Sequence, residues 1–97
     1  MAIEILEHKG IFEIFGTLRA HNLGALQIYF DLMIEKYDDL VIRLDRLEEL
    51  DVSAALYLEK LHEKARSMNK RVTLVSQENP EVERILLLTG TLYLYTE

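Results

Sequence analysis

The feature that most constrains the fold of this 97-residue chain is a repeated alternation of short apolar runs with segments of helical spacing. Residues 40–44 and 71–75 are short runs rich in β-branched side chains, which are typical of strands buried on both faces of a sheet. Between them, apolar residues recur every three or four positions from Ala54 to Met68, as they do along one face of a helix. Strands that alternate with helices favour right-handed crossovers, so we predict a mainly parallel sheet.

The first part of the chain predicts a hairpin followed by a helix. Between residues 2 and 17, apolar and polar residues alternate on either side of His8-Lys9-Gly10, which predicts two antiparallel strands joined by a tight turn. Apolar spacing then predicts a helix over about residues 22–36, which Asn22 is suited to cap. Asp51 is suited to cap the next helix in the same way.

The last part of the chain predicts a helix and a closing strand. Asn79 and Pro80 form a strong helix start, because proline at the first helical position leaves no donor unpaired. Gly90 ends this helix, and residues 92–95 form a strand. The predicted order is β-β-α-β-α-β-α-β, in a single α/β domain over residues 1–97. The predicted core comprises Ile42, Leu44, Leu58, Leu61, Val72, Leu74, Ile85 and Leu86.

A coiled coil is the alternative for the middle of the chain. Seven residues follow its spacing of three and four: Leu44, Leu47, Asp51, Ala54, Leu58, Leu61 and Ala65. Asp51 would then occupy a core position, and the seam lasts only about three heptads, the lower limit for a coiled coil. The α/β interpretation is therefore the favoured one.

Charge and composition exclude several classes of partner. The formal net charge is −6, whereas nucleic acids and anionic membranes attract clustered lysine and arginine. No stretch approaches the roughly 20 apolar residues that span a bilayer, so we expect no direct membrane insertion. The first residues lack the basic region of a signal peptide, so we expect a cytoplasmic protein.

The residues that catalysis or metal binding requires are absent or badly spaced. His8, His21 and His62 lie far apart, with no i, i+4 pair that could bind a metal from one helix. The absence of cysteine excludes a zinc–thiolate site and a thiol nucleophile. Acidic residues such as Glu48 and Glu81 lie where negative charge stabilises helix N-termini. We therefore expect a protein that binds partners, is not an enzyme and needs no cofactor or metal.

Three segments resemble motifs of STAS domains, the family of anti-sigma-factor antagonists. Residues 16–22 (Gly-Thr-Leu-Arg-Ala-His-Asn) resemble the glycine-any-leucine-aspartate-alanine opening that follows the second strand of that family. Residues 42–56 are similar to the family's central strand, loop and aspartate-serine-serine/threonine-glycine-leucine signature, and residues 80–90 are similar to its third helix. The resemblance covers about residues 10–95 and implies the strand and helix order given above.

The chain departs from the family pattern inside these motifs. Two family aspartates, a signature hydroxyl and a signature glycine are replaced by Arg19, Arg43, Val52 and Ala54 respectively. Of the signature's polar residues, Asp51 and Ser53 remain. We expect a divergent member that lacks the family's C-terminal helix.

The resemblance implies a regulator that switches partners. In antagonists of this family, the unphosphorylated protein binds an anti-sigma factor that is itself a serine kinase, and this kinase phosphorylates a hydroxyl of the signature. Phosphate adds about −1.5 to −2 charges, so a partner shaped for a neutral hydroxyl no longer fits. Ser53 is the phosphorylation candidate, and the alternative is a small residue that only fills the first helical turn.

The resemblance places the docking surface on the loop after the second strand and on the first turns of the second helix. The expected docking residues are Leu18, Arg19, His21, Asn22, Asp51, Val52, Ser53, Ala54 and Tyr57. We expect Arg19 to pair with Asp51, and the helix dipole to accommodate negative charge at Ser53.

Two other functions stay open. The chain could be a non-phosphorylated STAS scaffold, such as a subunit of a lipid-transport ABC complex or part of a signalling assembly. It could also be an unrelated α/β domain that binds a small molecule, which a pocket with convergent polar groups would support. A weak homodimer stays open as well.

Overall fold

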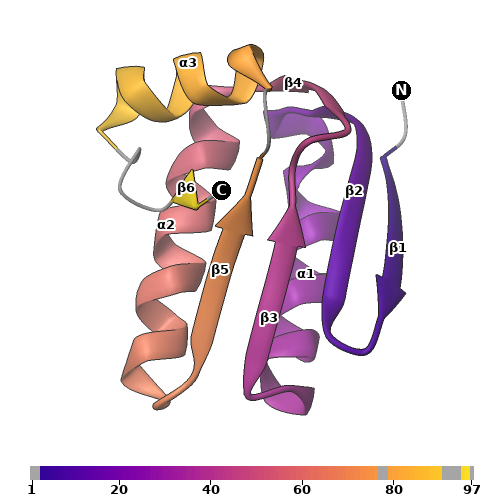
Figure 1. Ribbon diagram of the computed structural model, residues 1–97, viewed down its shortest axis with the longest axis vertical. Helices are drawn as coiled ribbons and strands as arrows, with labels where there is room; N and C mark the ends of the chain where they lie inside the picture. Colours follow the sequence, from indigo (N-terminus) through magenta and orange to yellow (C-terminus); the bar gives the residue numbers. More distant parts are fainter. Residues whose placement is uncertain (1–2, 77–78, 91–94, 97) are drawn as a thin grey trace.

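The computed structural model describes residues 3–76, 79–90 and 95–96, which form a mixed sheet and three helices (Figure 1). In chain order the elements are β1 (Glu4–His8), β2 (Ile11–Leu18), α1 (Ala20–Lys36), β3 (Asp39–Arg43), β4 (Leu47–Leu50), α2 (Val52–Ser67), β5 (Arg71–Val75), α3 (Pro80–Thr89) and β6 (Tyr95–Thr96). The strand order is β1-β2-β3-β5-β6, and β4 pairs with the end of β2. Strands β1 and β2 are antiparallel, and the other described pairs are parallel. The predicted α/β class and N-terminal hairpin are confirmed.

Helices α1 and α2 lie side by side against one face of the sheet, and α3 lies across the end toward which β3 and β5 point (Figure 1). Burial alternates along β3, where Leu40 and Ile42 are buried and Val41 and Arg43 are only half-buried. Strand β5 repeats this alternation. The expectation that these strands are buried on both faces is therefore wrong, because α1 and α2 both pack against the same face.

The core lies between this face of the sheet and the helices. All eight predicted core residues are buried there, which confirms the assignment of the helical and strand faces. Aromatic packing holds α1 against β2: the ring centroid of Phe12 lies 5.3 Å from that of Phe30 and 5.9 Å from that of Tyr37, both edge to face.

Several short segments adopt the local structures that their sequences predict. Lys9 (φ 53°) and Gly10 (φ 83°) make the hairpin turn, in the left-handed region that two-residue turns require. The Asn79 side chain caps α3 by accepting from Val82 N at 3.3 Å. Gly90 ends α3 with a left-handed backbone, as predicted.

Helix α1 begins two residues earlier than predicted, and Asn22 is not its cap. The helix starts at Ala20, and Asn22 lies in its first turn. The side-chain oxygen of Asn22 accepts a hydrogen bond from Arg19 N at 2.9 Å, and its amide nitrogen donates to Thr17 O at 2.8 Å. Asn22 therefore ties the helix start to the end of β2, in the way that the third residue of a capping box does.

Strand β4 is absent from the sequence prediction. It pairs with the end of β2 across an irregularity between Gly16 and Thr17, where Gly16 has a φ of 100° that favours glycine. The segment between β3 and α2 is therefore extended, and the coiled-coil alternative over residues 44–65 is wrong. Of the predicted strand over residues 92–95, residues 92–94 lie outside the described residues, and β6 pairs with β5.

Candidate functional site

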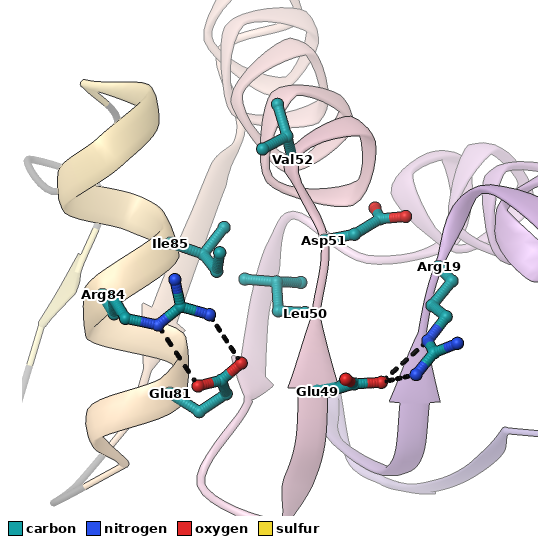
Figure 2. Close-up of a pocket in the computed structure, with 8 residues that line it drawn as sticks. All are labelled: Arg19, Glu49, Leu50, Asp51, Val52, Glu81, Arg84 and Ile85. Atoms are coloured by element: carbon teal, nitrogen blue, oxygen red, sulfur yellow. Dashed lines mark hydrogen bonds and ion pairs between the residues drawn. The ribbon is translucent and has the colours of Figure 1, made fainter.

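The candidate site lies at the edge of the sheet where β2 and β4 end and where α1 and α2 begin (Figure 2). The last residues of the two strands, Leu18 and Leu50, are partners in the parallel register. Arg19 and Asp51 follow them as the N-terminal caps of the two helices. The fold thus brings both predicted docking segments to the carboxyl ends of parallel strands, where α/β proteins usually build their sites.

Asp51 joins the two helix starts. One carboxylate oxygen, Oδ1, accepts from Ala54 N at 3.0 Å and from Ser53 Oγ at 2.8 Å. The other, Oδ2, accepts from Ala20 N at 2.8 Å. The Asp51 backbone N–H donates to Leu18 O at 3.0 Å. The predicted cap of α2 is therefore confirmed, and the same carboxylate also accepts a hydrogen bond from the first residue of α1.

These contacts set the charge of Asp51. Burial raises the pKa of the carboxyl group, but the hydrogen bonds from Ala54, Ser53 and Ala20, together with the nearby Arg19, outweigh it and lower the pKa below its ordinary value. The carboxylate is therefore ionised throughout the neutral range, and it accepts at both oxygens.

Ser53 lies at the second position of α2 and is half-buried. Its hydroxyl is held by the Asp51 carboxylate, with 2.8 Å between the two oxygens. A negative group at this position would face an ionised carboxylate as well as the helix dipole. The helix dipole therefore favours negative charge at Ser53, whereas repulsion from the Asp51 carboxylate opposes it. The sequence alone does not reveal this repulsion.

Arg19 pairs with Glu49 and not with Asp51, so the expected pair is wrong. Arg19 Nε lies 2.7 Å from Glu49 Oε1, and Nη2 contacts the same oxygen. Strand β4 causes this change, because it places Glu49 beside Arg19 at the edge of the sheet (Figure 2). The two side chains are 50% and 43% exposed, so the pair adds at most about 1 kcal/mol of stability.

A hollow of about 200 Å³ opens between this edge and α3. Its walls are Arg19, Glu49, Leu50, Asp51, Val52, Glu81, Arg84 and Ile85. Figure 2 shows the Arg19–Glu49 pair on the strand side and the Arg84–Glu81 pair on α3, where Arg84 Nη2 lies 2.9 Å from Glu81 Oε2. Sequence reasoning missed the α3 residues of this hollow, because only the packing of α3 on β4 brings them there.

The predicted docking residues divide by exposure. Arg19, His21 and Val52 are exposed, and Val52 is 48% exposed despite being apolar. Three residues lie half-buried at the surface: Asn22, Asp51 and Ser53. The side chains of Leu18 and Ala54 are fully buried and hold the edge together from beneath. Tyr57 is 8% exposed and lines a different hollow, between α1 and α2.

The signature residues thus lie where the resemblance places them, at a strand edge that meets the start of α2. The sequence pattern of the STAS domain matches the chain over residues 1–94. The chain belongs to the STAS domain family. Within that family, Asp51 and Ser53 form one hydrogen-bonded unit here despite the replacements at the neighbouring positions.

Solved structures agree with this STAS assignment. The anti-sigma factor antagonist SpoIIAA in its unphosphorylated form has a TM-score of 0.78 at 16% identity, covering 98% of this chain and 86% of that one. An anti-sigma factor antagonist from Mycobacterium paratuberculosis has a TM-score of 0.76 at 22% identity, covering 92% and 77%. The Bacillus cell fate determinant SpoIIAA in its phosphorylated form has a TM-score of 0.66 at 15% identity, covering 98% and 89%. At these identities the likeness shows the fold. No curated protein matches the sequence.

Two further properties concern the described part of the STAS domain. Within residues 3–76, 79–90 and 95–96, no group of three or more histidine, cysteine, aspartate or glutamate residues is arranged to hold a metal ion. His21 is exposed on α1, and His62 is half-buried on α2. No helix in this part of the chain is long and apolar enough to cross a bilayer.

Proposed function

We propose that this STAS domain is an anti-sigma-factor antagonist that works by partner switching. In its unphosphorylated form it binds a serine-kinase anti-sigma factor, and phosphorylation of Ser53 releases that partner. The proposal draws on the family match and on the likeness to two solved structures of anti-sigma factor antagonists. In this role the protein acts by binding rather than by catalysis.

The observation that carries the proposal is the position of the Ser53 hydroxyl. It lies on the first turn of α2, at the carboxyl ends of β2 and β4, and donates to an ionised carboxylate 2.8 Å away. Phosphorylation would add about −1.5 to −2 charges beside Asp51. Modification at this point changes the charge of a surface without touching the core, which supports a switch of partner rather than of fold.

The exposed part of this surface is arranged to meet a protein of mixed polarity. Arg19 and Arg84 are each paired with a glutamate, so neither cation is uncompensated. Val52 is exposed beside them and offers an apolar contact. This arrangement fits a partner whose docking surface is less basic than that of an anti-sigma factor that binds an acidic antagonist.

The experiment uses four forms of the protein as bait: wild type, Ser53→Ala, Ser53→Asp and Ser53→Asn. Captured proteins and any phosphate on Ser53 are identified by mass spectrometry, and the dissociation constant of the purified partner is then measured by calorimetry. Ser53→Asn matches Ser53→Asp in size but carries no charge, so it separates charge from bulk. Melting temperatures of all four forms establish that each is folded.

We expect Ser53→Ala to bind like wild type and to resist phosphorylation. Ser53→Asp should bind at least about tenfold more weakly than Ser53→Asn, because an unpaired negative charge at a desolvated contact is costly. If the partner binds Ser53→Asp and Ser53→Asn equally well, partner switching at Ser53 is excluded. A permease or ATPase component as the captured partner would instead assign the chain to a transport scaffold.

A further inference from the structure

The outer face of α1, which is the side turned away from the sheet, is apolar. The side chains that bury α1 against the sheet are Leu26, Phe30 and Ile34. On the opposite side of the helix, Gly24, Ile28 and Leu32 follow one another at intervals of four residues. Ile28 is 68% exposed and Leu32 is 61% exposed. Single exposed apolar residues are common, but large ones on successive turns form a continuous patch, which is typical of an interaction surface.

Helix α1 differs in this respect from α2, which packs beside it. The outer face of α2 is charged from its third turn onward, where the exposed residues include Lys60, Glu63, Lys64 and Arg66. Residues 20–30 of α1 contain no lysine, arginine, aspartate or glutamate, although 29% of the whole chain is charged. A helix that is apolar on all sides is normally buried on all sides. The composition of α1 therefore indicates a second buried surface, which the single chain does not provide.

Gly24 supports the same conclusion. It lies inside α1, where glycine is among the least favourable residues for helix stability. Its backbone is not in the left-handed region, and a Cβ atom at this position would meet no atom within 4 Å. Within the described part of the chain, neither backbone conformation nor packing therefore requires glycine here. A glycine on the surface of a helix does allow a side chain of another helix to approach the backbone closely.

We propose that the outer face of α1 is the interface of a homodimer, in which two α1 helices pack antiparallel across a twofold axis at Ile28. Gly24 and Leu32 each lie four residues from Ile28, so the axis places the glycine of one copy opposite the leucine of the other, twice. His21 and Glu35 each lie seven residues from Ile28, so the imidazole of one copy can donate to the carboxylate of the other at both ends. The face is thus complementary to itself in both size and polarity.

The antiparallel arrangement follows from the charges at the end of the helix. A parallel pair of α1 helices would bring the two Glu35 carboxylates together, and like charges at an interface are unfavourable. It would also place Gly24 opposite Gly24, which leaves the exposed leucines without a complementary depression. The antiparallel pair avoids both problems.

The size of the face indicates a weak dimer. A helix of 17 residues is about 25 Å long, so packing along one side of it buries on the order of 400 Å² in each copy. Stable interfaces bury about 800 Å² in each partner, so we expect a dissociation constant on the order of 100 μM. Each copy also carries a net charge of −6, and salt should strengthen association by screening this repulsion. Ser53 does not belong to this face, so the dimer does not depend on the proposed switch.

Sedimentation equilibrium of the full chain tests the dimer. At about 0.3 M salt, the average mass should rise from that of one chain toward that of two between about 10 μM and 1 mM protein. A chain that stays monomeric over this range would overturn the proposal. A monomeric chain that captures another protein, and loses it in Ile28→Glu, would overturn it as well and assign the face to that protein.

Ile28→Glu tests whether this face forms the dimer. It should weaken association at least about tenfold, because two added carboxylates would face each other at the twofold axis. Leu87→Glu is the matched control, since Leu87 on α3 is also 68% exposed and the change in charge is the same. The control should associate like wild type. Equal association of the two variants would exclude the outer face of α1 as the interface.

Gly24→Ala separates the cost to the helix from the benefit to the dimer. At low concentration it should raise the melting temperature by a few degrees, because alanine favours the helix and its methyl group has open space. It should weaken association about threefold or more, because the methyl group occupies the place of Leu32 of the second copy. A variant that is more stable and dimerises as well as wild type would contradict the close approach at Gly24.

A charge exchange tests the antiparallel arrangement. His21→Glu should weaken association about threefold or more, because it places carboxylates opposite each other at both ends of the interface. Adding Glu35→Lys in the same chain should restore association, and the helix dipole favours both changes at their ends of α1. If the second change does not restore association, the antiparallel pairing about Ile28 is wrong.

Discussion

Helices α1 and α2 begin side by side at the same edge of the sheet, but they begin in different ways. Helix α2 starts on a typical capping residue, because the Asp51 carboxylate accepts a hydrogen bond from the backbone of the first turn of α2. Helix α1 starts on Arg19, whose side chain accepts no capping hydrogen bond. The backbone N–H of Ala20 is instead satisfied by Asp51, 31 residues further along the chain.

This difference shows that one side chain supports two helices. The start of α2 is encoded locally, whereas the start of α1 depends on a contact that exists only after β4 has paired with β2. Asn22 supplies the local part of the α1 start, by linking Arg19 N to Thr17 O. This edge of the sheet is therefore stable only as a unit, and Asp51 is its central residue.

The largest expected effect comes from removal of the Asp51 carboxylate. Asp51→Ala should lower the free energy of unfolding by about 2–4 kcal/mol, because it removes the cap of α2 and leaves Ala20 N without an acceptor. Urea unfolding measures the loss. Asp51→Asn is the matched control, since an asparagine oxygen still caps α2 but its amide group cannot accept from Ala20. A loss in Asp51→Asn as large as in Asp51→Ala would mean that the bond to α1 carries the whole effect.

Acid should weaken the same contacts in a defined direction. The folded state lowers the pKa of Asp51, so the resulting stability is fully present above the ordinary aspartate pKa and is lost as the pH falls through the lower folded value. The stability difference between wild type and Asp51→Asn should therefore be constant from pH 7 to about pH 5 and shrink below about pH 4. Urea unfolding at a series of pH values measures it. A difference that grows on acidification would contradict the assignment.

Asn22→Ala should cost less, about 1–2 kcal/mol, because it removes hydrogen bonds at the start of α1 alone. Hydrogen exchange locates the effect: the amide of Arg19 should lose protection, whereas the amide of Ala54, held by Asp51, should keep it. Equal loss of protection at both amides would show that the start of α2 also depends on Asn22.

The parts of the fold that the sequence predicts are those that short segments determine. The cap of α2 at Asp51, the start of α3 at Asn79 and the turn at Gly10 each depend on a few adjacent residues, and all three form as predicted. Strand β4 could not be predicted in this way. Its Leu47 and Leu50 are three positions apart, which is helical spacing, and two glutamates separate them. The segment is extended because of its pairing with β2.

The residues of the candidate site also differ in whether short segments of sequence predict their contacts. Asp51 and Ser53 can be identified from the sequence, since they are two residues apart and belong to one signature. The partner of Arg19 cannot, because Glu49 reaches it through the unpredicted β4. The buried Tyr57 hydroxyl is likewise invisible in the sequence, since only the packing of α1 on α2 encloses it.

The smallest expected effect concerns the Arg19–Glu49 pair, a contact at this edge between two exposed side chains. Arg19→Gln and Glu49→Gln should each change the free energy of unfolding by at most about 1 kcal/mol, because water screens both charges and the long side chains lose freedom on pairing. A double-mutant cycle with the two variants isolates the interaction between them, and the coupling should decrease further at 0.5 M salt. A coupling well above 1 kcal/mol that resists salt would mean that the pair is a structural part of the α1 start, and that this start has a local anchor as strong as that of α2. A small coupling would leave the pair free to open, so that Arg19 could meet an acidic group of a partner at little cost to the fold.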